Sequence, residues 1–273
     1  MKKPKGQVFL VILIALSSVF SGCATMRKAS EPDEGEINAQ AARAYEEVKS
    51  KSKRSTNAEW TAMVNRVAQR IAANSGEKFQ WEAILIESPE VNAWCMPGGK
   101  MAVYTGIMPV LKNEGALAAV MGHEVAHATL RHGKKRYARA IQGNLLGIIV
   151  GGAAIVGGQL LCKSDSCRLM TGLGGAAAGF AVAFFDRKFS RDEESEADEA
   201  GQILMAKAGY EPAEAIQLWE RMGAASGGKS PPEWLSTHPS EGRRRENLKK
   251  WLPSAQSAYA QAPTKYGIGQ PIR

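Results

Sequence analysis

Histidine and cysteine are scarce in this chain, which has four of each among its 273 residues. Aromatic residues make up only 7% of the sequence and do not alternate with the basic residues, although the formal net charge is +8. The chain therefore lacks the basic and aromatic stripe that indicates a nucleic-acid-binding protein. It also lacks an internal repeat of roughly 20 to 50 residues, which argues against a solenoid. The few histidines leave a short list of candidate metal ligands.

Acidic residues are absent from the first 22 positions, which resemble a lipoprotein signal peptide. Three lysines precede an apolar run over residues 8–16, and small residues then lead to Ser21-Gly22-Cys23, which is similar to a bacterial lipobox. Ala24 follows the cysteine, as in lipoproteins sorted to the outer membrane. The sequence predicts lipidation at Cys23 and an outer-membrane lipoprotein that faces the periplasm of a Gram-negative bacterium, attached to the lipid bilayer by its N-terminal anchor. An uncleaved N-terminal helix is the alternative.

The other cysteines are Cys95, Cys162 and Cys167. Cys162 and Cys167 bracket a short loop, which a disulfide could close in an oxidising compartment, and we expect that bond in the secreted protein. Cys95 falls in a predicted strand, where it is expected to be a small buried residue.

Apolar spacing predicts an α+β domain that is mainly helical. Helical periodicity is found in four segments, residues 57–73, 114–132, 191–207 and 213–222, and a basic helix and a frayed tail follow them. Alternating apolar residues predict three short strands at residues 79–86, 91–96 and 101–104. Because turn residues separate these strands, we expect a small β-meander.

Two long uncharged stretches, residues 141–162 and 169–185, are rich in glycine and alanine. Their length approaches that of membrane-spanning helices, but their small side chains are weakly hydrophobic and suit close packing of two antiparallel helices. Basic residues flank the base of this hairpin on both sides, and the positive-inside rule would place that base in the cytoplasm, which a secreted lipoprotein cannot satisfy. We expect a soluble or membrane-leaning hairpin, with a spanning hairpin as the alternative.

The pentapeptide His123-Glu124-Val125-Ala126-His127 lies in a predicted helix and has the spacing of a zinc-peptidase motif. Residues four apart differ by about 40° around a helix axis, so the imidazoles of His123 and His127 project from one face and can share one Zn²⁺ per chain. Glu124 lies about 100° away, within reach of a metal-bound water, and is the predicted catalytic base. Two histidines packed in a core are the alternative.

A catalytic zinc ion needs three protein ligands and one open position. On a continued helix His132 would lie about 180° from His123, so we expect it to point away from the metal. The glycine and histidine that extend the metzincin motif are missing after His127. His238 and a carboxylate remain as candidates for the third ligand.

The acid-rich helix at residues 191–207 supplies that carboxylate. Glu194 shares one face of the helix with small residues, which would allow close packing against the histidine helix, so Glu194 is the predicted third ligand. Asp198, one turn later on the same face, can accept the free ring N–H of a histidine ligand. Glu196 and Glu199 are expected to point outward.

These motifs resemble the zinc peptidase family of the HtpX heat-shock protease and the CAAX-prenyl protease, and within it the periplasmic lipoprotein proteases similar to BepA and LoiP. The resemblance covers residues 57–252. It rests on four ordered motifs, which are Asn92-Ala93 with Pro97-Gly98-Gly99 and Tyr104-Thr105-Gly106, the pentapeptide, residues 190–198, and Thr237-His238-Pro239-Ser240 with Arg244 and Leu248.

The resemblance implies a mainly helical, zincin-like (gluzincin) metallopeptidase domain of the α+β class, with the small β-meander and the glycine- and alanine-rich helical hairpin. The expected organisation is a signal peptide (1–22), a lipid anchor and polar tether with a short helix (23–56), the peptidase domain (57–252) and a C-terminal tail (253–273).

The resemblance also implies roles for residues around the metal. The family histidine that matches His238 lies near the ion, where it either donates to the oxyanion or occludes the ion at rest, and we favour the donor role. Asn92 and Ala93 match a substrate-binding motif. Met101 and Val103 lie in a strand that resembles the edge strand on which these enzymes pair the substrate backbone.

The predicted function is that of a zinc-dependent metalloendopeptidase that cleaves misfolded or misassembled cell-envelope proteins. Its expected partners are unfolded envelope polypeptides, the lipid bilayer and the outer-membrane assembly machinery. The alternatives are an inner-membrane HtpX-like protease with a spanning hairpin, and a chaperone-like assembly factor with a resting zinc site.

Overall fold

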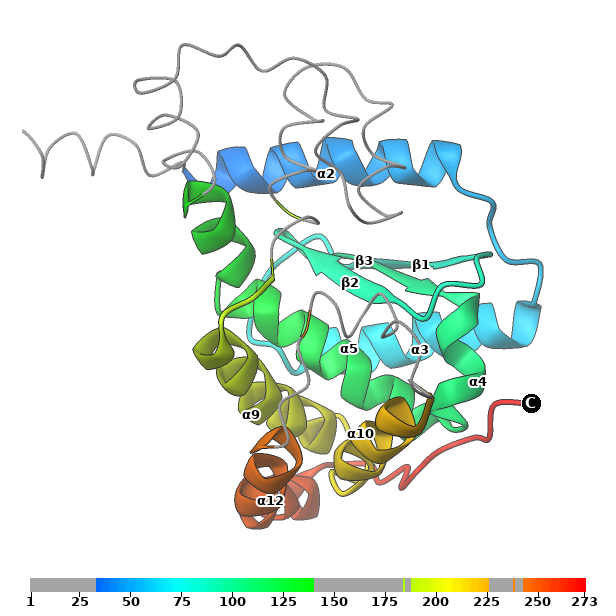
Figure 1. Cartoon of the computed structure of the whole chain (residues 1–273), viewed down its shortest axis with the longest axis vertical. Helices are drawn as coiled ribbons and strands as arrows, with labels where there is room; N and C mark the ends of the chain where they lie inside the picture. The colour runs from blue at the N-terminus through cyan, green and yellow to red at the C-terminus, as the bar shows by residue number, and fades with distance from the viewer. Residues whose placement is uncertain (1–32, 140–183, 185–187, 226–237, 239–242) are drawn as a thin grey trace, which may run out of the picture.

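The computed structural model describes residues 33–139, 184, 188–225, 238 and 243–273 (Figure 1). The predicted signal peptide, Cys23, nearly all of the glycine- and alanine-rich hairpin, Cys162 and Cys167 lie outside these residues. Among the helices that are described, none combines the length and the apolar character needed to cross a membrane.

The sheet has three strands, β1 (Glu82–Ile86), β2 (Ala93–Met96) and β3 (Lys100–Tyr104), in the order β1-β3-β2. β2 and β3 are antiparallel and are joined by the predicted glycine turn, in which Gly98 and Gly99 have φ of 78° and 87°. β1 runs parallel to β3, so the predicted β-meander is wrong.

The loop between β1 and β2 explains this order. Thr105, directly after β3, donates its hydroxyl to the Ser88 carbonyl at 2.9 Å and accepts from the Ser88 amide at 3.0 Å. The chain crosses so closely there that a Cβ on Gly106 would lie 2.2 Å from the Pro89 carbonyl oxygen. The loop therefore passes the end of β3, and β3 lies between the other two strands.

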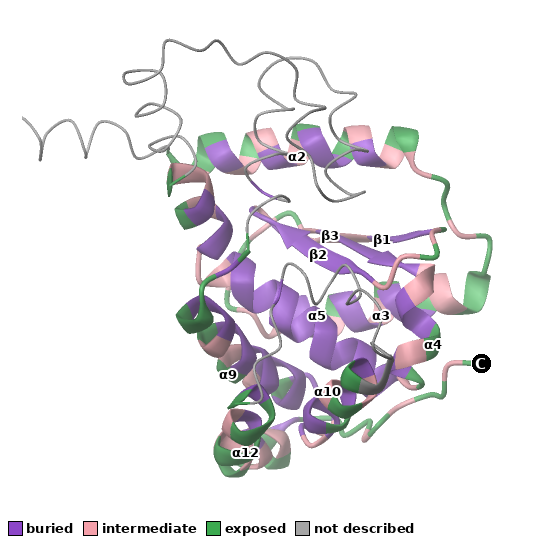
Figure 2. Cartoon of the chain, viewed as in Figure 1, coloured by how far each residue is buried: buried purple, intermediate pink, exposed green. Residues whose placement is uncertain are grey.

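Helix α2 (Glu34–Lys51) covers one face of the sheet, and α3 (Ala58–Ala73) and α5 (Glu114–Thr129) lie on the other (Figure 1). Both faces of the strands are therefore buried (Figure 2). The segment predicted as a polar tether with a short helix contains α2, which is longer than expected and is part of the core. Its buried Tyr45 meets the Trp94 ring edge-on at 6.2 Å between centroids.

The helices of the second layer follow the predicted periodicity. Asn57 caps α3 through a bond from the Trp60 amide, as its sequence position indicates. Helix α9 (Arg191–Lys207) has the predicted bounds, and α5 ends three residues earlier than predicted. Further helical elements are η1 (Thr105–Ile107), α4 (Met108–Leu111), α10 (Glu214–Ala225) and α12 (Arg243–Gln261), and residues 132–139 are also helical.

Helices α5 and α9 approach each other closely because both have glycine at the crossing. A Cβ on Gly122 would lie 2.7 Å from the Gly201 carbonyl oxygen, and a Cβ on Gly201 would lie 2.7 Å from the His123 amide nitrogen. Ala197 is fully buried on the same face of α9. The small residues that the sequence placed on this face therefore bring the acidic helix against the histidine helix.

The last residues of the chain are ordered, so the predicted frayed tail is wrong. Helix α12 continues past Pro253 to Gln261, and the following segment contacts the N-terminal end of α5. The amides of Glu114 and Gly115 donate to the carbonyls of Gln270 and Ile268, each at 2.8 Å. The tail thus satisfies two of the unpaired N–H groups at the start of α5.

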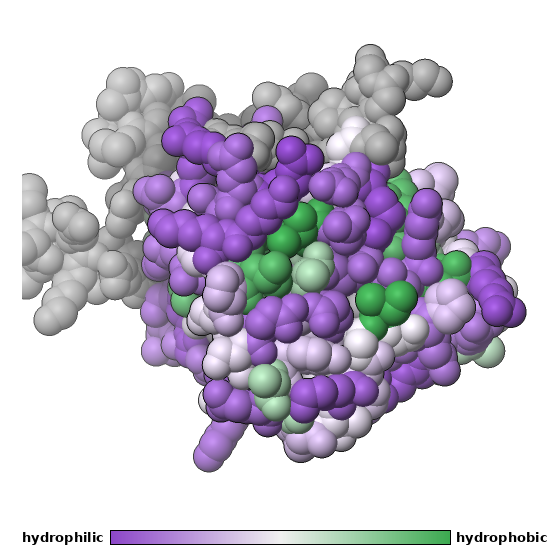
Figure 3. All heavy atoms as spheres, turned by 90° about the horizontal axis from the view of Figure 1, so that it is seen from below, coloured by the Kyte–Doolittle hydropathy of each residue, from purple (hydrophilic) through white to green (hydrophobic). Residues whose placement is uncertain are grey.

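Seen from below, the molecular surface is mostly hydrophilic with small apolar clusters (Figure 3).

Glu114 joins this tail to the domain. Its carboxylate is buried and accepts from Arg66 at 3.0 and 3.1 Å, from Arg70 at 2.9 Å, from the Tyr210 hydroxyl at 2.7 Å and from the Gln270 amide at 3.2 Å. Burial alone would raise the pKa of Glu114, but the bonds from Arg66, Tyr210 and Gln270 hold it below its ordinary value.

We expect Glu114→Gln to lower the free energy of unfolding by about 2–3 kcal/mol near neutral pH. This is less than the roughly 3–5 kcal/mol lost when one partner of a fully buried ion pair is removed, because Arg66 and Arg70 keep partial contact with water. A lowered pKa in the folded state stabilises the fold above the unfolded value of about 4.3, and this contribution is lost as the pH falls through the folded pKa. Urea titrations should therefore show the wild-type advantage shrinking below about pH 4.3. Glu199→Gln, at an exposed position, is the control, and a pH-independent difference would contradict the assignment.

Candidate metal centre

His123 and His127 lie on one face of α5 and are both buried. Their Nε2 atoms are 3.0 Å apart, which the four-residue spacing on a helix permits. Helix α5 is buried around almost its whole circumference, so these imidazoles lie inside the domain (Figure 2).

Glu194 reaches the two histidines from the first turn of α9. Its Oε1 is 3.5 Å from His127 Nε2, and its Oε2 is 3.6 Å from His123 Nε2. The neighbouring Glu193 is held elsewhere, because its side chain accepts from the Ser190 amide in a capping box and from Arg139. The cap fixes the rotation of α9 so that Glu194, and not Glu193, faces the histidines.

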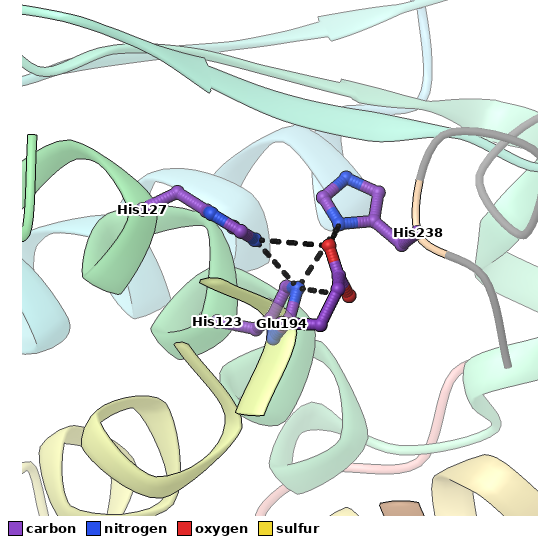
Figure 4. Close-up of side chains that lie close together, drawn as sticks. All are labelled: His123, His127, Glu194 and His238. Atoms are coloured by element: carbon purple, nitrogen blue, oxygen red, sulfur yellow. Dashed lines mark hydrogen bonds and ion pairs between the residues drawn. The ribbon is translucent and has the colours of Figure 1, made fainter. Parts of the chain in front are cut away.

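His238 completes the cluster. Its Nδ1 lies 3.1 Å from His123 Nε2 and 2.9 Å from Glu194 Oε1 (Figure 4). The four side chains thus offer three ring nitrogens and a carboxylate oxygen, all within 4.8 Å of one another.

The spacing of these four donors fits one metal ion. Donors at about 2.0–2.1 Å from a tetrahedral ion are separated by about 3.3 Å, and the contacts given above range from 2.9 to 3.6 Å. Imidazole nitrogens with one carboxylate form a donor set that suits Zn²⁺. The residues present therefore can hold such an ion.

Glu124 is buried beside the cluster and is not one of the four donors. Its Oε1 lies 3.5 Å from His238 Nε2. His238 thus faces the cluster with one ring nitrogen and Glu124 with the other.

A carboxylate and an arginine support the ligands from behind. His123 Nδ1 is 2.9 Å from Asp198 Oδ1, the contact expected from the sequence. Arg244 forms two hydrogen bonds to Asp198, at 2.6 and 2.5 Å, and an ion pair with Glu194 at 2.6 Å. Its guanidinium also lies over the Trp219 ring, 3.8 Å from the centroid.

Arg244 was missed as a site residue, although it belongs to a motif that carried the resemblance. Burial would raise the carboxyl pKa of Glu194 and Asp198. For Glu194, the charge and hydrogen bonds of the neighbouring histidines and the charge of Arg244 hold the pKa far below its ordinary value. For Asp198, Arg244 and then His123 lower the pKa. Both acids are therefore ionised and able to bind or orient ligands.

Comparison with known proteins identifies the family to which this chain belongs. The profile described as Peptidase family M48 matches residues 54–252, which include all four donors, Glu124 and Arg244. The chain belongs to peptidase family M48. The predicted enzyme class, a metalloendopeptidase, and the resemblance at family level are both confirmed.

Similar M48 proteins come from several kinds of organism. The chain is 38% identical over 200 residues to the mitochondrial metalloendopeptidase OMA1 of Schizosaccharomyces pombe, covering 72% of this chain and 54% of that protein. It is 32% identical over 181 residues to the mitochondrial metalloendopeptidase OMA1 of Homo sapiens, covering 65% and 33%. It is 28% identical over 181 residues to the Beta-barrel assembly-enhancing protease of Escherichia coli, covering 66% and 36%. The chain spans about half the length, or less, of these relatives.

These comparisons correct the predicted localisation. The outer-membrane lipoprotein facing the periplasm of a Gram-negative bacterium is wrong, because the M48 relatives with the higher identities are named as mitochondrial proteins. The prediction depended on residues 1–24, which lie outside the segment matched to the family. A basic and apolar N-terminal run is shared by several kinds of targeting signal, so it could not specify one compartment.

His132 does not point away from the M48 metal centre as the sequence predicted. Helix α5 ends at Thr129, Arg131 has a φ of 61°, and a new helical segment begins at His132. His132 is therefore fully buried, with its Nδ1 2.9 Å from His127 Nδ1. The prediction for His132 was wrong because it assumed that α5 continues to residue 132.

Met101 and Val103 are not in an edge strand. β3 pairs with β1 on one side and with β2 on the other, so the backbone beside these residues already belongs to the sheet, and their predicted role in pairing with substrate is wrong. The outer strand β2 lies nearer the metal helix (Figure 1). Asn92 directly precedes β2, and Ala93 is its first residue. Cys95 of β2 is a buried free thiol and lines the same small pocket as His127.

Proposed function

We propose that this M48 chain is a zinc-dependent endopeptidase that cleaves unfolded, misfolded or misassembled polypeptides. The observation that carries the proposal is the buried cluster of His123, His127, Glu194 and His238 with Glu124 beside it. A bound zinc ion would polarise the scissile carbonyl and lower the pKa of water. Three of these donors match the ligand set of a catalytic zinc site, which keeps its fourth position open to water or substrate.

Glu124 is the proposed general base. It is buried next to the donors without being one of them, which suits a group that takes a proton from water and passes it to the leaving amine. Arg244 and Asp198 hold Glu194 and His123 in place, so Glu124 acts beside a rigid ligand set.

The proposed substrate contacts are Asn92 and Ala93. They stand at the start of β2, the outer strand nearest the metal helix, and a substrate backbone extended along that strand would be recognised without regard to sequence. This supports unfolded chains as the substrate class.

Quality control of membrane-associated proteins is the proposed setting. Its support is the pair of similarities to a protease named for β-barrel assembly in Escherichia coli and to the mitochondrial OMA1 proteins. Recognition of an extended substrate backbone along β2 would suit unfolded chains, which agrees with such a role.

The test uses the purified full chain with casein and with a folded protein as substrates. Casein should be degraded, a chelator should stop the reaction, and stoichiometric zinc should restore it. Elemental analysis should give one zinc per chain. Casein hydrolysis that is insensitive to the chelator, or a protein that binds no metal, would contradict the proposal.

The geometry further supports a closed resting state, in which His238 fills the fourth position and lies beside Glu124. We expect His238→Ala to raise basal casein hydrolysis about tenfold or more, because an open minor state is typically populated at about 0.1–10%. Rates should be measured at saturating zinc, with metal content determined in parallel.

The alternative role of His238 makes the opposite prediction. If it donates a hydrogen bond to the oxyanion, His238→Ala should lower kcat about 10²-fold or more with zinc retained. Such a loss would contradict the closed state, as would a variant identical to the wild type in rate and metal affinity.

A further inference from the structure

His132 and Glu196 connect the metal ligand His127 to the surface. His132 is fully buried, its Nδ1 is 2.9 Å from His127 Nδ1, and its Nε2 is 3.0 Å from Glu196 Oε2. The Glu196 side chain is 56% exposed, so the row of groups ends in solvent. His132 is not among the four donors of the cluster.

The position of His132 depends on an unusual backbone turn. Arg131 is one of the non-glycine residues with positive φ, a conformation that costs free energy in most residues. Its guanidinium is held by Glu77 at 2.6 and 3.1 Å and by Glu34 at 2.8 Å, and it lies over the Phe79 ring. Contacts from α2 and from the segment before β1 therefore maintain the turn that brings the His132 ring within hydrogen-bond distance of His127.

The hydrogen bonds have only one consistent direction when His127 binds a metal through Nε2. A neutral His127 then carries its proton on Nδ1 and donates it to His132 Nδ1. His132 must accept there, so its own proton is on Nε2 and is donated to the Glu196 carboxylate. Each group in the row fixes the tautomer of the next.

We propose that His132 and Glu196 are positioning residues that fix the tautomer and orientation of His127 and thereby strengthen metal binding. This inference rests on the metal site proposed above. Metal-bound histidines commonly donate their second N–H to a carboxylate, and here the carboxylate acts through an intervening imidazole.

The two histidine ligands are then supported in parallel from one helix. His123 donates directly to Asp198, and His127 reaches Glu196 through His132. Both acids lie on α9, the helix that also provides Glu194. The Phe189 ring stacks on His127 at 3.8 Å between centroids, so only the in-plane orientation of His127 is left for His132 to fix.

The test compares zinc affinity, by competition with a chelator, among variants of the full chain. His132→Leu removes the acceptor for His127 and should weaken zinc binding about 10- to 100-fold. His132→Asn keeps an acceptor near the position of Nδ1 and should lose less. Glu196→Gln, at an exposed position that should not affect folding, should lose severalfold. Glu199→Gln, on the same helix without a contact to His132, is the matched control.

Cobalt(II) absorption provides a second measurement that depends on ligand geometry. The bands of the cobalt-loaded protein should shift in His132→Leu and Glu196→Gln and stay unchanged in Glu199→Gln. Unchanged affinity and spectrum in Glu196→Gln, with zinc still bound by the wild type, would overturn the role of Glu196. His132→Asn that is as weak as His132→Leu would overturn the role of the His132 acceptor. A wild-type chain that binds no zinc would instead refute the proposed function.

Discussion

Glu124→Gln is expected to lower the rate of casein hydrolysis by about 10²–10⁴-fold, the contribution of a positioned general base. The amide keeps the size of the carboxylate but cannot accept the proton of the attacking water. Since Glu124 is not one of the four donors, the zinc content should remain one per chain. The loss should appear in kcat, because Glu124 acts after the substrate is bound.

The measurement pairs initial rates at saturating substrate with elemental analysis of the same preparation. Glu199→Gln removes one negative charge from an exposed position and should retain the wild-type rate. A Glu124→Gln enzyme with more than about a tenth of the wild-type rate would remove Glu124 from the role of base. Loss of zinc together with activity would instead place Glu124 among the ligands.

Glu194→Ala is expected to weaken zinc binding by at least about 100-fold, more than the change of a supporting residue does. It removes the only carboxylate among the four donors. It also leaves the Arg244 guanidinium, which pairs with Glu194 at 2.6 Å, with a single acidic partner and next to the histidine ligands. A positive charge that is less well neutralised disfavours a cation nearby, so both effects act in the same direction.

Glu193→Ala is the matched comparison, one residue earlier on α9. Glu193 closes the capping box with Ser190 and pairs with Arg139, so its loss should lower stability by about 1 kcal/mol without releasing zinc. Zinc retained in Glu194→Ala and lost in Glu193→Ala would show that the other glutamate faces the metal. Chelator competition and thermal unfolding, both measured on each variant, separate the two effects.

The metal helix and the acidic helix could be predicted because their information is local. The spacing of His123 and His127 places them on one face of a helix, and the small residues beside Glu194 mark the face of α9 that packs against it. The glycines at the crossing, Gly122 and Gly201, agree with that interpretation. Helix periodicity depends on neighbouring residues only, so it can be read before the fold is known.

The sheet order and the role of α2 could not be predicted in this way. Alternation identifies a strand but not its neighbours, and β3 lies in the middle because the loop around Ser88 and Pro89 is tied to Thr105 and Gly106. The charged sequence around α2 suggested a polar tether with a short helix and not a part of the core. The five buried residues of α2 recur at helical spacing from Ile37 to Val48, but that spacing does not show which surface they cover. Only the tertiary structure shows that they pack on the sheet.

The sequence by itself determined that this chain has a metal-binding histidine pair, a nearby glutamate and an acidic helix that fits against them. Only the tertiary structure showed that His238 lies within the donor cluster, that Arg244 holds Glu194 and Asp198, and that His132 contacts His127. These placements depend on where helices end and which segments meet. The turn at Arg131 is held by Glu77 and Glu34, which are distant in sequence, so no periodicity near His132 could reveal it.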